Sequence, residues 1–360
     1  MAFIVDVDAF FVAAISSAIF LRKVGLMKRN TLFCTALSMF SLSAVMPVHA
    51  LTIVANFENS ITGASNSSLI QGAINSAIGV IDGLYGNNVS LAVNFTYTAS
   101  AVGNLLSTYQ YYDGFSYSDY TTALKKDASA NPSNIVLATA IANLSSGNDA
   151  NGAKDIAVST GLAQMLGLAG AAPSNEVPII NINSLITNWA YSQASGSTST
   201  YDLVGGLEHE LDEVLGGGGA GSTLNAIAAS GNVFFTSKMG PLDLYRYSSA
   251  NTPSFTTLSS AAAYFSVDGG NTSIVAFNQN SRGDYADFGP QCNPTGNQNI
   301  QNAFNCTGVD AAYTQGSPGF AMMQALGWSA ATTVPEPTVM VLLVTGIIGF
   351  VATRRRKFSE

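Results

Sequence analysis

The residues best suited to chemistry are gathered in one short segment, residues 205–216, with the sequence GGLEHELDEVLG. The chain has two histidines, and one of them, His49, lies in a stretch with the features of a cleaved leader. The other histidine, His209, stands in the short segment among four acidic residues: Glu208, Glu210, Asp212 and Glu213. Imidazole nitrogen and carboxylate oxygen both bind divalent cations. The segment is therefore a candidate metal site.

This segment is expected to form a helix over about residues 202–216. Apolar side chains recur at the spacing of one helical face, whereas His209 and Glu213 fall on the opposite face. A run of four glycines that begins at Gly216 ends the helix. One face therefore packs against the protein, and the other carries the candidate ligands. The apolar residues are Leu203, Val204, Leu207, Leu211, Val214 and Leu215.

The spacing of these residues is that of a metallopeptidase. Such an enzyme needs two ligands one helical turn apart and a carboxylate beside the first ligand, because this carboxylate must reach the water that the metal activates. His209 and Glu213 have the ligand spacing, and Glu210 has the position of the general base. The pattern HExxExxG resembles the zincin motif HExxHxxG, with Glu213 in place of the second histidine. The resemblance implies a zinc site, although a carboxylate ligand makes manganese or calcium more competitive.

A third ligand must come from elsewhere in the chain. Metzincins place a histidine three residues after the glycine, and this sequence has Gly219 there. We expect an oxygen ligand instead, from Asp243 in PLDLYRY or from Asp268 in a DGGN turn. Asp284 and Asp287, in RGDYADFG, are interpreted as a calcium site or, more simply, as solvated carboxylates of a turn.

Other residues allow both a functional and a structural interpretation. Met322 and Met323 resemble the methionine turn beneath metzincin sites, but two core residues of a closing helix would look the same. Arg246 and Arg282 are interpreted as partners of acidic residues rather than as oxyanion stabilisers. Acidic helix faces also occur by chance in acidic proteins, so a non-catalytic protein remains the alternative.

The charge balance excludes one class of partner. Residues 51–333 contain six basic and eighteen acidic residues. Binding to nucleic acid requires clustered Lys and Arg that neutralise phosphates. We therefore expect no nucleic-acid partner, and an acidic cleft would favour basic or neutral peptides.

Two cysteines, Cys292 and Cys306, lie in the predicted mature chain. An even number of cysteines in an exported protein favours a disulfide. The loop between them offers too few further ligands for a cysteine-based metal site. The sequence therefore predicts that Cys292 and Cys306 form a disulfide.

The N-terminal region predicts export. Met27 opens a signal peptide, residues 27–50, with a basic start at Lys28 and Arg29, an apolar core and a small-x-small cleavage site before Leu51. Residues 1–26 are interpreted as an upstream mis-start, with a genuine N-terminal extension as the alternative. In both cases the mature protein is expected to leave the cytoplasm.

The C-terminal region, residues 334–357, has three parts of a sorting signal. Pro335, Glu336 and Pro337 precede an apolar stretch that can enter a membrane as a helix, and a basic tail follows. The region resembles the PEP-CTERM signal of Gram-negative bacteria. That resemblance implies recognition by an exosortase, removal of the tail and delivery to the periplasm, outer envelope or extracellular matrix. Signal peptidase is the partner expected at the N-terminal signal. A permanent single-span anchor is the alternative. The tail contains Arg354, Arg355, Arg356 and Lys357.

Hydrophobic periodicity predicts an α+β fold. Residues 51–57 and 89–97 alternate as strands do, and residues 68–84 between them have helical spacing. Further helices are expected over 118–128 and 153–168, and further strands over 135–142 and 177–182. After residue 216 we expect a loop- and hairpin-rich half, because its strand patterns are short. These patterns cover 233–236, 243–247, 264–267 and 274–277.

Four stretches together resemble a family of PEP-CTERM-sorted metalloprotease-like proteins with the core HExxEV[LM]G. They are HELDEVLG, LDLYRYS, YFSVDGGNTSIVAFN and SPGFAMMQALGW. The resemblance implies a zincin-like domain over residues 51–333, with Glu210 as general base, His209 and Glu213 as metal ligands and a peptide or protein substrate. The alternative is a non-catalytic protein of the exopolysaccharide matrix or cell surface on a degenerate zincin scaffold.

Overall fold

The computed structural model describes residues 51–101, 103–144, 155–168, 176–192, 198–225, 237–289 and 298–331. They belong to one compact unit, His49–Thr332. The predicted leader and the predicted sorting signal lie outside the described residues. Among the described residues, no helix has both the length and the apolar character needed to cross a membrane. The described part of the chain is a mixed α+β fold with seven α-helices and several small sheets.

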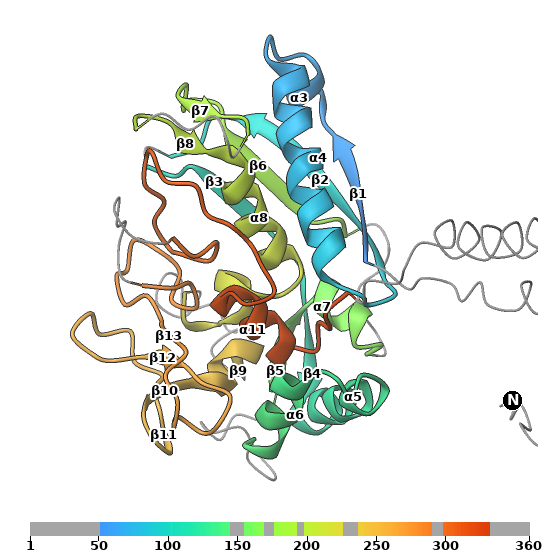
Figure 1. Cartoon of the computed structure of the whole chain (residues 1–360), viewed down its shortest axis with the longest axis vertical. Helices are drawn as coiled ribbons and strands as arrows, with labels where there is room; N and C mark the ends of the chain where they lie inside the picture. Colours follow the sequence, from blue (N-terminus) through green and yellow to red (C-terminus); the bar gives the residue numbers. More distant parts are fainter. Residues whose placement is uncertain are drawn as a thin grey trace, which may run out of the picture. The chain divides into compact units, whose positions relative to one another are not determined.

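A four-stranded sheet in the order β1-β2-β6-β3 forms the N-terminal layer (Figure 1). Its parallel strands are β1 (Thr52–Phe57), β2 (Ser90–Thr98) and β6 (Ile179–Asn183). The fourth strand, β3 (Leu106–Tyr109), pairs antiparallel with β6 and is the edge strand. The alternating pattern of β2 buries every second side chain, among them Val93 and Phe95, against the core.

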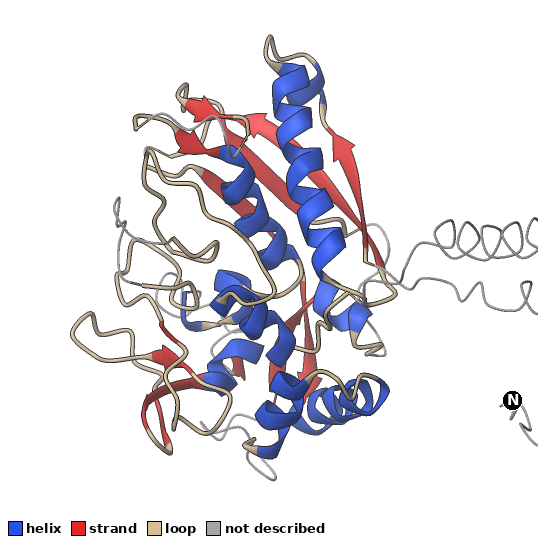
Figure 2. Cartoon of the chain, viewed as in Figure 1, coloured by secondary structure: helices blue, strands red, loops and turns tan. Residues whose placement is uncertain are grey.

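Two helices, α4 (Ser67–Leu84) and α8 (Leu203–Val214), pack against each other beside this sheet (Figures 1 and 2). α4 connects β1 to β2 after the short helix α3 (Asn59–Thr62), as expected for parallel neighbours. Its buried face includes Ile70, Ile74 and Ile81 at helical spacing. α8 also contacts β3. The helix with the candidate ligands thus lies beside the edge strand.

A second, smaller sheet combines β4 (Tyr112–Ser116), β5 (Asp155–Ser159) and β9 (Lys238–Met239). Three helices lie between or after its strands in the chain. Each begins at a residue whose side chain accepts a hydrogen bond from the backbone of the first helical turn. These N-cap residues are Ser116 for α5 (Tyr117–Ala130), Asn134 for α6 (Ile135–Ala142) and Ser159 for α7 (Thr160–Met165).

The C-terminal half consists of short elements joined by long loops (Figure 2). It ends in the helix α11 (Pro318–Ala325). The short pair β7 (Trp189–Ala190) and β8 (Tyr201–Asp202) precedes α8. The remaining elements are η2 (Gly218–Gly221), η3 (Pro241–Tyr245), β10 (Arg246–Ser249), β11 (Thr252–Pro253), β12 (Tyr264–Phe265) and β13 (Val275–Ala276).

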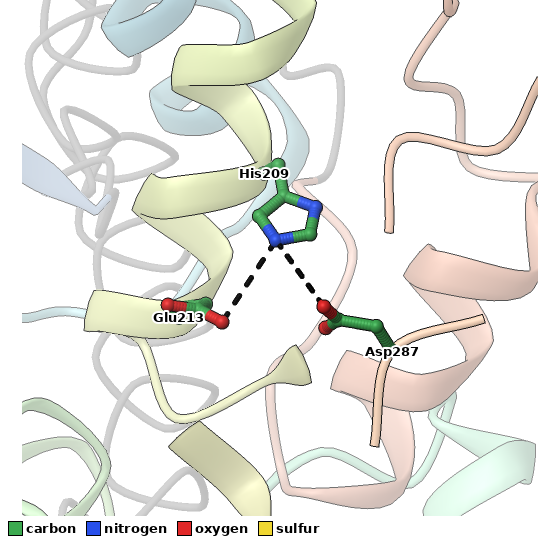
Figure 3. Close-up of side chains that lie close together, drawn as sticks. All are labelled: His209, Glu213 and Asp287. Carbon is green, nitrogen blue, oxygen red and sulfur yellow. Dashed lines mark ion pairs between the residues drawn. The ribbon is translucent and has the colours of Figure 1, made fainter. Parts of the chain in front are cut away.

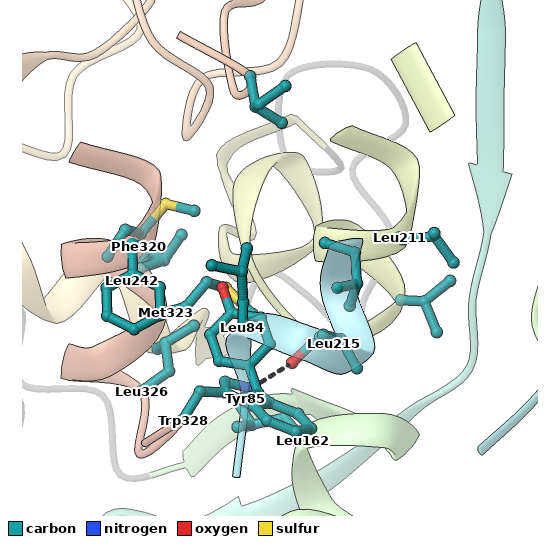
Figure 4. Packing of buried hydrophobic residues seen from close by; sticks show 14 of the residues in the cluster. Leu84, Tyr85, Leu162, Leu211, Leu215, Leu242, Phe320, Met323, Leu326 and Trp328 are labelled. Atoms are coloured by element: carbon teal, nitrogen blue, oxygen red, sulfur yellow. Dashed lines mark hydrogen bonds between the residues drawn. The ribbon is translucent and has the colours of Figure 1, made fainter. Parts of the chain in front are cut away.

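The hydrophobic core joins the two halves around the C-terminal end of α8 (Figure 4). Trp328 is fully buried, and its indole nitrogen donates to the carbonyl oxygen of Leu215 at 3.1 Å. Tyr85 stacks on Phe320, with 5.5 Å between ring centroids. These contacts hold the C-terminal end of α8 in the hydrophobic core. The helix is therefore a rigid support for His209 and Glu213 on its polar face.

The structure confirms the α+β class and most of the expected N-terminal elements. Two expectations were wrong. Residues 135–142 form the helix α6 rather than a strand, and residues 155–159 form the strand β5 before α7 instead of continuing one helix. Part of residues 243–247 lies in the 3-10 helix η3. The strands expected over 264–267 and 274–277 are present as the antiparallel pair β12 and β13, whereas residues 233–236 lie outside the described residues.

Candidate metal centre

The helix α8 begins and ends where its sequence allows. Asp202 Oδ1 accepts a hydrogen bond from the backbone nitrogen of Gly205 at 3.0 Å and caps the first turn. At the other end Gly216 has a φ of 97°, which favours glycine, and its nitrogen donates to the carbonyl of Glu213 at 2.9 Å. The next glycine, Gly217, has no room for a side chain, because a Cβ there would lie 2.5 Å from Met323 Sδ. These two glycines therefore allow the sharp turn of the chain directly after α8.

His209, Glu213 and Asp287 form a buried group that could hold a metal ion (Figure 3). His209 Nε2 lies 3.8 Å from Glu213 Oε1 and 3.6 Å from Asp287 Oδ2. One potential ligand atom from each residue lies within 4.8 Å of the other two. One nitrogen and two carboxylate oxygens around a common point are a ligand set that divalent cations accept.

The polar contacts of His209 determine which ring nitrogen can bind a metal. Gln301 Nε2 lies 3.3 Å from each of the two ring nitrogens. His209 Nδ1 lies 3.1 Å from the carbonyl oxygen of Ile300. Because a carbonyl oxygen only accepts, Nδ1 must carry the proton, and Nε2 then keeps its lone pair. Histidine ligands of metal sites are commonly oriented in this way.

The two oxygens of Asp287 have different surroundings. Oδ1 accepts hydrogen bonds from the backbone nitrogen of Gly219 and from Gln301 Nε2, both at 3.0 Å. Oδ2 is the atom that faces His209. Asp287 is only 3 % exposed, so its orientation is fixed by the protein rather than by solvent. One oxygen holds the side chain, and the other can bind a cation.

Glu210, the expected general base, is buried and lines the same cavity as the candidate ligands. Its Oε2 accepts a hydrogen bond from Thr108 Oγ1 of β3 at 2.5 Å. Burial raises the pKa of Glu210 to about 7, while the charge of His209 and the bond from Thr108 oppose the rise. Glu210 is absent from the group of three candidate ligands. A carboxyl group with this pKa can both accept and return a proton near neutral pH.

A cavity of about 600 Å³ opens onto these residues. The edge strand β3 forms one side, α8 the floor, and residues 281–287 and 302–305 the other sides. The acidic and basic side chains in its lining are one histidine, one exposed arginine and four carboxyl groups. They are His209, Arg282, Glu210, Glu213, Asp284 and Asp287.

The electrostatics of this cavity favour a cation. Burial raises the pKa of Glu213 well above its usual range, and repulsion from Glu210 and Asp284 adds to the effect. Burial also raises the pKa of Asp284 and that of Asp287 to about 7 each, and repulsion from Asp287 contributes to the shift at Asp284. Several carboxylates share one poorly solvated space, so their ionisation needs a compensating positive charge. A divalent cation would provide it.

Two expected third ligands lie elsewhere, which corrects the prediction. Asp243 is buried, but both of its oxygens accept hydrogen bonds from Ser222, Thr223 and Gly240, and it stabilises the start of η3. Asp268 binds Ser266 and Thr272 within its own turn. Asp287, interpreted from the sequence as a calcium ligand or a solvated turn residue, is instead buried beside His209.

Other predicted residues have structural surroundings. Arg246 is 1 % exposed, donates to Gln279 Oε1 at 2.7 Å and lies over the ring of Phe277. These partners are an amide and an aromatic ring rather than the acidic side chains expected from the sequence. Met322 and Met323 are fully buried on α11. Cys306 is buried and disulfide-bonded, whereas its expected partner Cys292 lies outside the described residues.

The sequence also singled out two acidic residues of α8 that do not line the cavity, Glu208 and Asp212. Both are fully buried, and Asp212 accepts a hydrogen bond from the hydroxyl of Tyr313. Gln301 was missed entirely, because nothing in its local sequence separates it from the other Asn and Gln residues nearby.

Comparison with known proteins finds no matching family model, no similar curated protein and no similar solved structure. The site is therefore defined by its geometry alone.

Proposed function

We propose that the protein is an exported metal-dependent peptidase of zincin-like architecture. The observation that carries the proposal is the convergence of His209, Glu213 and Asp287, with Glu210 on the same helix and in the same cavity. The general base and two ligands come from one helix, and the third ligand comes from the loop-rich half. Catalysis by metal and base needs these roles to be separate, because a base that occupies the metal cannot take a proton from water.

The ligand set suits zinc, with manganese and calcium as alternatives. Zinc accepts one imidazole and two carboxylates with an open position, whereas an oxygen-rich set also suits harder cations. A bound cation would lower the pKa of a water molecule and polarise the peptide carbonyl. His209 would contribute Nε2, with its proton held on Nδ1 by Ile300, and Asp287 would contribute Oδ2.

Glu210 is proposed to take the proton from the attacking water and to return it to the leaving amine. Its hydrogen bond from Thr108 keeps the carboxylate at the wall of the cavity between α8 and β3. This role needs a carboxyl group that is buried enough to hold a proton and close enough to receive one. The proposal therefore assigns no ligand role to Glu210.

The edge strand β3 supports a peptide as the substrate. The carbonyl oxygen of Leu105 accepts from the nitrogen of Asn183 in the neighbouring strand segment at 3.0 Å. Since pairing alternates along an antiparallel ladder, the backbone groups of Leu106 and Thr108 are directed away from β6. An extended peptide could pair with this edge above the cavity. The acidic lining favours basic or neutral peptides.

The sequence signals support an extracytoplasmic location. Residues 27–50 would direct export and be removed by signal peptidase, and residues 334–357 would be recognised by an exosortase at the membrane. We propose a protein of the periplasm, outer envelope or extracellular matrix of a Gram-negative bacterium, anchored in the membrane only transiently. Fractionation of cells that express the full chain, with and without Pro335–Pro337 replaced by alanines, tests this assignment.

The first experiment is elemental analysis of the exported protein, with His209→Ala and Glu210→Gln as variants. We expect about one transition metal per native chain, loss of the metal in His209→Ala and retention in Glu210→Gln. Peptide hydrolysis should fall by about 10² to 10⁴ in Glu210→Gln, the range for loss of a general base. A native chain without bound transition metal, or with a metal content that His209→Ala does not change, would contradict the proposal.

One observation favours a second function. The site has a single nitrogen ligand, and the remaining candidate ligands are carboxylates, as in calcium sites that stabilise extracellular proteins. The alternative is a non-catalytic matrix or surface protein on a zincin-like scaffold. It would bind calcium in preference to zinc, and Glu210→Gln would leave its properties unchanged.

A further inference from the structure

Two of the three candidate ligands are supported by consecutive residues of one segment, residues 298–306. The carbonyl oxygen of Ile300 accepts from His209 Nδ1 at 3.1 Å, and Gln301 Nε2 donates to Asp287 Oδ1 at 3.0 Å. Ile300 is 4 % exposed and Gln301 is fully buried. The segment thus supplies hydrogen bonds to two candidate ligands, and its residues 302–305 also line the cavity.

This segment is fixed to the backbone next to Asp287. The nitrogen of Phe288 donates to the carbonyl of Gln301 at 2.7 Å, and its carbonyl accepts from Ala303 at 3.0 Å. Gln298 Nε2 donates to the carbonyl of Phe304 at 3.2 Å within the segment. These bonds limit the freedom of Gln301 relative to Asp287.

The chemistry of the pair determines how the Gln301 amide is oriented. A carboxylate oxygen accepts, so the amide nitrogen and not the amide oxygen must face Asp287 Oδ1. The same nitrogen lies 3.3 Å from each ring nitrogen of His209, which places the amide over the imidazole face. Gly218 leaves space for it, because a Cβ there would lie 2.0 Å from Gln301 Nε2.

Packing alone does not account for a glutamine at this position. Its amide oxygen is buried and has no hydrogen-bond partner among the described residues. An unpaired buried oxygen is unfavourable for folding, and a methionine of similar volume would avoid it. The hydrogen bond from the Gln301 amide nitrogen to Asp287 Oδ1 is therefore the property that distinguishes glutamine from methionine at this position.

We propose that Gln301 is a positioning residue of the metal centre, which holds Asp287 through its amide nitrogen so that Oδ2 faces His209 Nε2. This inference rests on the metal site of the proposed function and names the residue that sets its affinity. Without Gln301, Oδ1 would keep the bond from Gly219 alone, and the carboxylate could rotate away from His209. Ligands that are oriented before binding lose less freedom when the metal arrives.

The test is calorimetric titration of the metal-free exported protein with zinc chloride and with manganese chloride. Gln301→Met should weaken binding about 10- to 100-fold, as does loss of other groups that orient ligands. Gln301→Glu should weaken it at least as much, because a second carboxylate cannot donate to Asp287. Gln164→Met, at an exposed glutamine of α7, is the matched control and should bind as the native chain does.

Thermal unfolding of the metal-free variants separates positioning from a structural role. Gln301→Met removes the unpaired oxygen, which favours folding, and also removes the hydrogen bond to Asp287 Oδ1, which opposes it. The positioning role therefore requires a loss of affinity in a variant that is fully folded at the temperature of the titration. A variant that loses stability but keeps native affinity would overturn the inference.

The remaining outcomes are distinct. If Gln301→Glu binds metal as tightly as the native chain or more tightly, the hydrogen bond from Gln301 to Asp287 is not needed and the positioning role is wrong. If the native chain binds metal, loses it in His209→Ala and keeps it in Gln301→Met, this inference fails and the proposed metal site stands. If the native chain binds no metal, both fail together.

Discussion

Two buried aspartates of the C-terminal half, Asp243 and Asp287, differ in how their oxygens are used. Both oxygens of Asp243 accept hydrogen bonds: Oδ1 from Ser222 Oγ at 2.6 Å, and Oδ2 from the nitrogens of Thr223 at 3.1 Å and Gly240 at 2.9 Å. The two hydrogen bonds to Asp287 both reach Oδ1, and Oδ2 faces His209.

This contrast separates a structural carboxylate from a candidate ligand. Burial raises the pKa of both groups; at Asp243 several hydrogen bonds and Arg246 oppose the rise. A carboxylate whose oxygens are all bonded gains little from a cation, whereas one with an oxygen turned towards an imidazole gains a partner for its charge. Burial and residue type are the same in the two cases, so the distribution of hydrogen bonds over the two oxygens is what makes Asp287 the candidate ligand.

The largest expected effect is that of Asp287→Asn on metal binding. The asparagine keeps an oxygen for Gly219 and Gln301 but offers an amide nitrogen, which is no ligand, in place of Oδ2. Binding should weaken by at least about 100-fold, beyond the range for residues that only orient ligands. Titration with zinc chloride measures it, and Asp268→Asn, at a turn aspartate outside the site, is the control. Native affinity in Asp287→Asn would remove Asp287 from the ligand set.

Asp243→Ala should have the opposite pattern. It removes the acceptor for Ser222, Thr223 and Gly240, and should lower the free energy of unfolding by about 2 to 3 kcal/mol, the cost of leaving buried donors unpaired. Urea unfolding of the metal-free protein measures this loss. Metal stoichiometry should stay native below the unfolding transition. A variant that is stable but has lost its metal would reverse the comparison and restore Asp243 as a ligand.

The site residues that are close together in the sequence could be predicted, and those far from α8 in the sequence could not. His209, Glu210 and Glu213 lie on one helix, so their spacing alone predicts a shared face, and α8 is present as expected. Asp287 and Gln301 reach the site only through the fold of the C-terminal half. No periodic pattern distinguishes Asp287 from Asp243 or Asp268, so the third candidate ligand could not be selected from the sequence.

The fold has the same limit. The strands β1 and β2 and the helix α4 have long, regular patterns and were predicted correctly. The run IVLATAIA of α6 is apolar almost throughout, and such a short run suits a strand or a helix equally. In the structure Asn134 caps α6 and Ser159 caps α7. Neither residue was interpreted as a helix start from the sequence.

A third carboxylate, Asp127 on α5, sharpens the comparison with the smallest expected effect. Its Oδ1 accepts from Asn131 Nδ2 at 3.0 Å, and its Oδ2 is buried with no hydrogen-bond partner among the described residues. Unlike Asp287, it belongs to no group of candidate ligands among the described residues. Burial raises its pKa from 3.8 to about 6. Its ionisation therefore destabilises the folded state, and no candidate ligand group in the described part of the chain includes it.

The sign of the pH effect follows from this raised pKa. The folded state holds the proton of Asp127 more tightly than the unfolded state, so its contribution to stability is complete below about pH 4 and is lost as the pH rises to about 6. Asp127→Asn keeps the bond from Asn131 and removes the charge. It should raise the free energy of unfolding at pH 7 by about 1 kcal/mol, a value reduced for the partial exposure of the group, and should leave it unchanged at pH 4. Urea unfolding at both pH values measures the difference. An equal rise in the free energy of unfolding at pH 4 and at pH 7 would mean that the charge of Asp127 is not the cause. An unpaired buried oxygen would then not be enough to separate a destabilising carboxylate from a candidate ligand.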